Sequence, residues 1–136
     1  MLGETLMILF GHSLVPSERI YHIDSIEAIL HTPSNSIIAI DFSKENMDII
    51  EHAKSNRIRF ALFIKNQVEA VIGENLGATY LIMNAKNGNP LQIIADFYLF
   101  NAKVLGYCEF EEKLQDLIDM RFDGAVFDDA IVRVGS

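Results

Sequence analysis

Five short and almost uninterrupted apolar runs constrain the fold of this 136-residue chain more than any other feature. A strand that buries one face alternates apolar and polar residues, whereas a continuous apolar run indicates a strand buried on both faces. Such strands are typical of a parallel sheet whose two faces are covered. The runs are residues 37–40, 60–64, 80–83, 104–107 and 125–127. Their ends follow one another at steps of about 19 to 24 residues, which indicates tandem strand-helix units with short loops.

Helix start signals lie between these runs. Ser43 precedes the segment 44–55, and Asn66 is followed by Glu69 at the spacing of a capping box. Residue 90 is a proline at a first helical position, and 109–112 provides an acidic first turn. We therefore expect four helices between the five strands.

Apolar residues at three-to-four spacing predict which face of each helix packs on the sheet. We interpret these stripes as core rather than as partner-binding grooves, because every helix that covers a sheet shows one. The stripes are Met47, Ile50 and Ala53; Val68, Val71 and Ile72; Leu91, Ile94 and Phe97; and Leu114, Leu117 and Ile118.

The chain is predicted to form a single α/β domain over residues 1–136, since no linker rich in Gly, Ser or Pro divides it. Residues 37–128 form the tandem strand-helix core. Residues 1–36 do not show this strand-helix repeat. We expect them to form an irregular N-terminal segment that adds one or two strands at an edge. The alternating segment 131–134 predicts a final short strand.

Two architectures satisfy this pattern. The first is a three-layer α/β/α fold with an open, mostly parallel sheet of five to seven strands, flavodoxin-like or receiver-like. The alternative is half of a (β/α) barrel, built of tandem βα units and completing its curvature by dimerising. A closed eight-stranded barrel typically takes about 250 residues, so the length of this chain favours the open sheet.

The strand order that residues 37–128 can form resembles that of the response-regulator receiver domain. Asp41 stands where such domains place an acidic residue, at the end of the first strand. Asn84 stands in place of the phosphoacceptor aspartate, and Asp128 in place of the lysine. Since an asparagine cannot form an acyl phosphate, the resemblance implies the architecture and no phosphoacceptor function. The Ser/Thr-rich phosphate loop of a flavodoxin is likewise replaced by residues 41–44.

The charge balance excludes several kinds of partner. Asp and Glu number 19 against 11 Lys and Arg, a formal net charge of −8. Nucleic-acid and anionic membrane surfaces select basic stripes, which this chain lacks, so we expect neither partner. Cys108 has no second cysteine to pair with, and no apolar run approaches the roughly 20 residues of a membrane span. We expect a cytoplasmic protein.

Polar residues at the strand ends are the candidate ligand-binding positions, because ligands bind at the carboxyl ends of parallel strands. In an open sheet with the first strand in the middle, Lys65 and Asn84 flank Asp41 and can converge on a small anion; an ion pair between Asp41 and Lys65 is the structural alternative. The polar loop 86–90 precedes a helix N-terminus, which favours anions. The candidates are Asp41, Lys65, Asn84, Lys86, Gly88 and Asn89.

Other chemical signatures do not appear in the sequence. There is no nucleotide, dinucleotide or common zinc motif, and the four histidines are dispersed, so we predict no metal and no cofactor. Catalytic residues stay unknown. His12 alone is placed where a base could act, and Cys108 is interpreted as a buried thiol rather than a nucleophile.

Two functions stay open. The first is a non-catalytic interaction or regulatory module that acts as a homodimer, because 50% of this short chain is hydrophobic and its strand ends assemble no known catalytic set. Successive aromatic and apolar residues at 97–100 cannot all face one sheet, which points to a contact with the N-terminal segment or another subunit. The alternative is a small enzyme or sensor that binds a phosphorylated or carboxylated metabolite at the strand ends.

Overall fold

The structure, a computed structural model, describes residues 6–84 and 100–135 and shows one sheet of eight parallel strands. Neighbouring strands follow the order β1-β7-β6-β5-β4-β3-β2-β8. The strands are β1 (Ile8–Phe10), β2 (Ile20–Ile23), β3 (Ile37–Asp41), β4 (Phe60–Ile64), β5 (Tyr80–Asn84), β6 (Lys103–Cys108), β7 (Gly124–Phe127) and β8 (Ile131–Val134).

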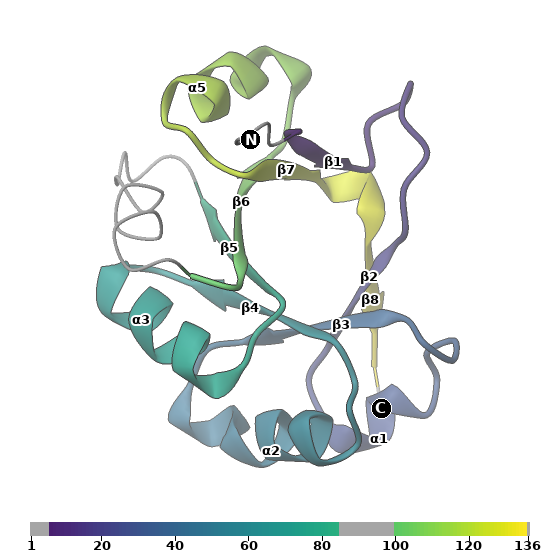
Figure 1. Ribbon diagram of the computed structural model, residues 1–136. Helices are drawn as coiled ribbons and strands as arrows, with labels where there is room; N and C mark the ends of the chain where they lie inside the picture. The colour runs from purple at the N-terminus through teal and green to yellow at the C-terminus, as the bar shows by residue number, and fades with distance from the viewer. Residues whose placement is uncertain (1–5, 85–99, 136) are drawn as a thin grey trace.

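The helices lie outside the ring that these strands form (Figure 1). Three short 3₁₀ helices complete the described part of the chain, and two of them lead directly into α-helices. The α-helices are α1 (Ile26–Ile29), α2 (Met47–Ser55), α3 (Gln67–Leu76) and α5 (Leu114–Asp119), and the 3₁₀ helices are η1 (Lys44–Asn46), η3 (Glu111–Lys113) and η4 (Asp128–Ala130).

Local capping explains where the helices begin. The Ser43 side chain accepts a hydrogen bond from the backbone of Glu45 at the start of η1, which continues into α2. Asn66 accepts from the Glu69 backbone at 2.9 Å, while the Glu69 carboxylate accepts from the backbone of Lys65 at 2.8 Å. Both predicted start signals are therefore confirmed.

The sheet is strongly curled, because each strand is staggered against the next. Rows of paired residues run obliquely, so that the first residue of β1 shares a row with the last residue of β3. A staggered parallel sheet must tilt its strands and bend towards a barrel. One such row passes through Ile8, Gly124, Leu105, Ile82, Phe63 and Asp41.

The two edges of the curled sheet approach one another at Gly11, just after β1. A Cβ atom at this position would lie 2.8 Å from the backbone nitrogen of Ala130, which ends η4 and directly precedes β8. Gly11 also has φ of +86°, a left-handed conformation that side chains disfavour. Glycine here lets the end of β1 lie directly against η4, the connection from β7 to β8. The strands thus form a nearly complete ring (Figure 1).

The two faces of the sheet form two separate hydrophobic cores. Along β3, Ile38 and Ile40 pack in the cluster that contains the helix residues, whereas Ile37 and Ala39 belong to a second cluster built almost wholly from strands. The second cluster lies inside the curl, since the helices lie outside it. Both faces of β3 to β7, the strands of the continuous apolar runs, are thus largely buried, as those runs predict.

The predicted α/β class and parallel sheet are confirmed, and the curled form corresponds to the barrel-related alternative. The sheet has eight strands rather than five to seven, because β1 and β2 in the N-terminal segment and β8 at residues 131–134 all join the five predicted strands. β1 joins β2 through residues 11–19, and β7 joins β8 through the three residues of η4. Neither of these two connections contains an α-helix, so they add these strands with few residues.

The predicted helix faces are only partly right. In α2, Ile50 and Ala53 are fully buried as expected. In α3 the prediction is wrong: Val68 is 68% exposed, and Val71 and Ile72 are 39% and 42% exposed. The stripe Leu91, Ile94 and Phe97 lies outside the described residues.

The smallest residues of α3 face the sheet instead of its largest ones. Ala70 and Gly73 are the buried residues of this helix. A Cβ atom on Gly73 would lie 2.7 Å from Leu81 Cδ2, so α3 sits too close to β5 for a larger side chain. In α5, Leu117 is buried as predicted, whereas Ile118 is 48% exposed. A helix that packs this close to the sheet needs small residues on the packed face. The spacing of apolar residues along the sequence does not reveal the distance between helix and sheet.

We expect the substitution Gly124→Ala to destabilise the seam between β1 and β7. Its Cβ atom would lie 2.3 Å from the backbone oxygen of Ile8 and 2.8 Å from Leu105 Cδ2, so β1 must shift. Overpacking of this kind lowers the free energy of unfolding by about 1–3 kcal/mol, which urea titration measures. Gly135→Ala is the control, because its Cβ atom has no neighbour within 4 Å. Equal losses in the two variants would contradict the packing described for this seam.

Candidate functional site

The inner face of the curled sheet becomes polar at the carboxyl ends of its strands. In β2, His22 follows Ile20 on the inward-facing register; in β8, Arg133 follows Ile131. In β3, Asp41 continues the same register. We call this polar end of the sheet the mouth, and define it by His22, Asp41, Tyr107, Asp128 and Arg133.

A cavity of about 370 Å³ opens at the mouth, between the ends of β8, β2 and β3. We call it the mouth cavity. Five of its lining residues have polar side chains, and two have aliphatic side chains. The lining residues are His22, Ile23, Asp24, Asp41, Asn46, Arg133, Val134 and Gly135. The carboxyl ends of parallel strands are where barrel and open α/β proteins bind their ligands.

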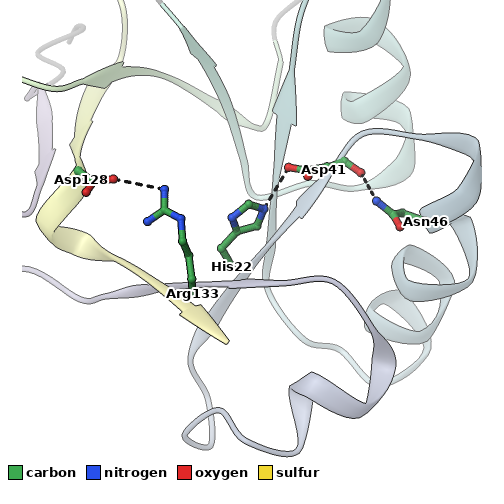
Figure 2. Close-up of polar contacts among 5 residues, drawn as sticks. All are labelled: His22, Asp41, Asn46, Asp128 and Arg133. Carbon is green, nitrogen blue, oxygen red and sulfur yellow. Dashed lines mark hydrogen bonds and ion pairs between the residues drawn. The ribbon is translucent and has the colours of Figure 1, made fainter. Parts of the chain in front are cut away.

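His22 is held against Asp41 by a direct hydrogen bond. Its Nε2 atom lies 3.0 Å from Asp41 Oδ1 (Figure 2). The ring also contacts the ring of Phe63, with centroids 4.8 Å apart. The backbone carbonyl of Asp41 accepts a hydrogen bond of 2.8 Å from the side chain of Asn46 in η1. Residues of the strands β2, β3 and β4 and of the 3₁₀ helix η1 therefore hold the pair His22 and Asp41.

Arg133 lies directly opposite His22 on the neighbouring strand. Its Nη2 atom is 3.3 Å from Asp128 Oδ1, and both side chains are more than half exposed. An ion pair so exposed contributes little to the stability of the fold. The guanidinium also has further N–H donors that can bind another anion. Figure 2 shows Arg133 and His22 between the two carboxylates Asp128 and Asp41.

Tyr107 donates a hydrogen bond of 2.8 Å to the same oxygen of Asp128. Burial of the phenol, together with this hydrogen bond and the nearby carboxylate charge, raises the pKa of Tyr107 to about 12. The phenol is thus a stable proton donor at neutral pH, and it holds the Asp128 carboxylate in place beside Arg133.

A second cavity, of about 180 Å³, lies beside the mouth and is markedly acidic. His12 contacts the carboxylate of Glu111 there, and its ring lies against Phe127 with centroids 5.4 Å apart. Glu109 and Asp129 also line this cavity. Across residues 6–84 and 100–135, however, no three His, Cys, Asp or Glu side chains are grouped so as to hold a metal ion.

A larger hollow, of about 620 Å³, lies at the amino ends of β3 and β4. Two arginines, Arg57 and Arg59, line it. Arg59 donates two hydrogen bonds to Glu18, at 2.8 and 3.2 Å, and a third of 2.7 Å to the Asn35 carbonyl. The hydrogen bonds from Arg59 hold the pKa of Glu18 below its usual range. The mouth is the better candidate site despite its smaller cavity, because it lies at the carboxyl ends of the strands, where barrel and open α/β proteins bind ligands.

The predicted site residues are only partly brought together. Asp41 lines the mouth cavity, whereas Lys65 is exposed beyond β4. In the described ranges no ion pair involves Lys65, and the partner of Asp41 is His22, so the predicted rim ion pair is wrong. Asn84 ends β5, and β4 separates it from β3, so Lys65 and Asn84 do not flank Asp41. Lys86, Gly88 and Asn89 lie outside the described residues.

His22, Tyr107 and Arg133 are the mouth residues that the sequence did not single out. A signal for two of them was present: Ile20 and His22, like Ile131 and Arg133, are two residues apart on short strands and therefore share a face. What the sequence lacks is any sign that these strands pair with each other and curl around a cavity.

Cys108 is fully buried at the end of β6. Its Sγ atom donates a hydrogen bond of 3.0 Å to the carbonyl of Phe110, and burial raises the pKa of the thiol. A buried thiol with a raised pKa is a poor nucleophile, so we assign it no place in the site.

Comparison of the sequence with protein-family models and with curated proteins gives no match. In the part of the chain that the structure describes, the helices are all too short or too polar to cross a membrane. The chemistry of the mouth is therefore the basis on which a function can be argued.

We expect Asp128→Asn to lower the pKa of Tyr107, because the variant removes the carboxylate charge that opposes phenolate formation. Since the folded pKa lies above the unfolded value of about 10, Tyr107 stabilises the fold below pH 10 and loses this contribution between about pH 10 and 12. Ultraviolet titration, with Tyr107→Phe subtracted, measures the pKa. An unchanged pKa in Asp128→Asn would contradict the contact.

Proposed function

We propose that this protein binds a small carboxylated or phosphorylated metabolite in the mouth cavity. The observation that supports this most is the placement of Arg133 directly opposite His22, on two neighbouring strands that line the cavity. A guanidinium presents a planar fork of donors that matches a carboxylate or a phosphate. The position at the carboxyl ends of parallel strands supports the same proposal.

The other lining groups define the rest of the ligand. Asp24 offers acceptors for hydroxyl or amino groups, and Asn46 offers an amide. Ile23 and Val134 provide a small apolar surface for a short carbon skeleton. About 370 Å³ falls at the low end of ligand pockets, which fits a metabolite of a few carbon atoms.

Binding requires the anion to compete with Asp128 for the guanidinium. The Arg133 to Asp128 contact is long and exposed, so little free energy is lost when it is shared. The net charge of −8 repels an anionic ligand, so binding depends on the local attraction of Arg133. Salt screens that attraction, and the affinity for the anion should therefore fall as the salt concentration rises.

Thermal unfolding with inorganic phosphate, pyruvate and 3-phosphoglycerate tests this function. We expect at least one anion to raise the Tm by about 3–6 °C at a tenfold excess over its Kd. Arg133→Gln should abolish the shift, because it removes the cationic fork. Arg19→Gln, which removes an arginine just before the amino end of β2, is the matched control. The proposal fails if no anion stabilises the protein or if Arg133→Gln responds like the wild type.

A second candidate function, association as a homodimer, is supported by the outer face of α3. Val68, Val71 and Ile72 are all exposed there, and together they form an apolar strip on one helix. If this strip joins two copies, Val68→Glu should convert dimer to monomer in sedimentation measurements, while Glu51→Gln on α2 should not. A wild-type protein that is monomeric at all concentrations would exclude this candidate.

A further inference from the structure

The hydrogen bond between His22 and Asp41 determines which ring nitrogen of His22 is basic. A carboxylate only accepts hydrogen bonds, so the Nε2 atom, 3.0 Å from Asp41 Oδ1, holds the proton in the neutral ring. The Nδ1 atom then has the free electron pair. The tautomer is thus assigned from the hydrogen bond, as in other sites where a carboxylate orients a histidine.

The basic nitrogen of His22 faces the side on which Arg133 lies. Figure 2 shows the ring nitrogen that is not bonded to Asp41 directed towards the guanidinium. The two residues are paired across β2 and β8, whose backbones are about 4.8 Å apart. An anionic group bound by Arg133 therefore places the adjoining atoms of the same ligand beside Nδ1.

The base is also held rigidly enough for a defined reaction. The His22 side chain is only 24% exposed, and it is confined between Asp41 and the ring of Phe63. Asn46 holds the backbone of Asp41, from which the carboxylate reaches His22. A nearby base, an orienting carboxylate and an anion-binding arginine are the parts that proton transfer from a bound carbon acid requires.

We propose that His22 is a general base that removes a proton from a carbon next to the carbonyl of the bound anion, with Asp41 as its positioning residue. This inference rests on the proposed function, since Arg133 must bind the ligand. The substrate class is a small anionic carbonyl compound, either a 2-oxo carboxylate or a ketose phosphate. The carboxylate or phosphate binds to Arg133, and the carbonyl carbon lies towards His22.

In the forward step the C–H bond breaks and a new N–H bond forms at His22 Nδ1. The electron pair of the C–H bond enters the carbonyl system, which becomes an enolate. Asp41 stabilises the imidazolium through Nε2, and the guanidinium lies beside the developing negative charge. Returning the proton to the substrate regenerates neutral His22, so no oxidant, reductant or second substrate is needed. In heavy water the net reaction replaces C–H by C–D.

Proton NMR in D₂O tests this step with two probes, pyruvate and dihydroxyacetone phosphate. We expect the wild-type protein to exchange the protons next to the carbonyl of at least one probe faster than buffer alone. His22→Gln should reduce the protein-catalysed rate by about 10²- to 10⁴-fold, the usual contribution of a general base. His52→Gln, on the outward helix α2, is the matched control and should exchange at the wild-type rate.

Asp41→Asn separates a positioning residue from a merely structural one. If Asp41 orients the base, this variant should lower kcat for exchange and leave KM nearly unchanged. A split of this kind, with kcat lowered and KM kept, is the signature of a group that acts on the base and not on substrate binding. A loss of stability with unchanged kcat would overturn the positioning role.

The binding and catalytic proposals fail in different ways. If an anion raises the Tm through Arg133 but neither probe exchanges faster than in buffer, the proton-transfer proposal is overturned and the binding function stands. If folded His22→Gln exchanges either probe at the wild-type rate, His22 is not the base. If no anion binds, the proposed function itself fails. Circular dichroism of each variant confirms that the fold is retained.

Discussion

Burial of the central strands, β3 to β7, on both faces is the constraint on which the structure depends. A flat parallel sheet needs a layer of helices on each side, and a chain of 136 residues supplies few helices. The staggered strands curl instead, so the inner face packs against itself and the helices cover only the outer face (Figure 1). The connections from β1 to β2 and from β7 to β8 contain no α-helix, so they use few residues. Gly11 permits the close contact with Ala130, and Gly124 permits the close contact with Ile8.

The candidate site arises from the same inward-facing register. Inside the curl the strands present Ile, Ala and Leu side chains, which fill the space between opposite strands. At the carboxyl ends the interior opens to solvent, and the next inward residues are His22, Asp41 and Arg133. Because these residues stand on the strand framework rather than on long loops, their mutual positions are set by strand pairing and stagger. A rigid framework of this kind can hold a base and an anion-binding group in register.

Sequence reasoning succeeded where the signal is local. The five continuous runs are strands with nearly the predicted bounds, and Ser43 and Asn66 cap the helices as expected, since both features depend on residues only a few positions apart. It failed for α3, where a close approach to β5 selects Ala70 and Gly73 and leaves Val68 outside. That distance depends on how two elements pack, which periodicity does not encode.

The amino-acid sequence by itself determined the α/β class, the parallel strands and the polar strand ends, including Asp41. Tertiary structure alone decided which of those ends meet. β2 and β8 come from opposite ends of the chain, and only their pairing places His22 opposite Arg133. The physical reason is that the two-residue period of a strand fixes which face a residue occupies, whereas stagger and curvature, which are properties of the whole sheet, fix its neighbours across the cavity.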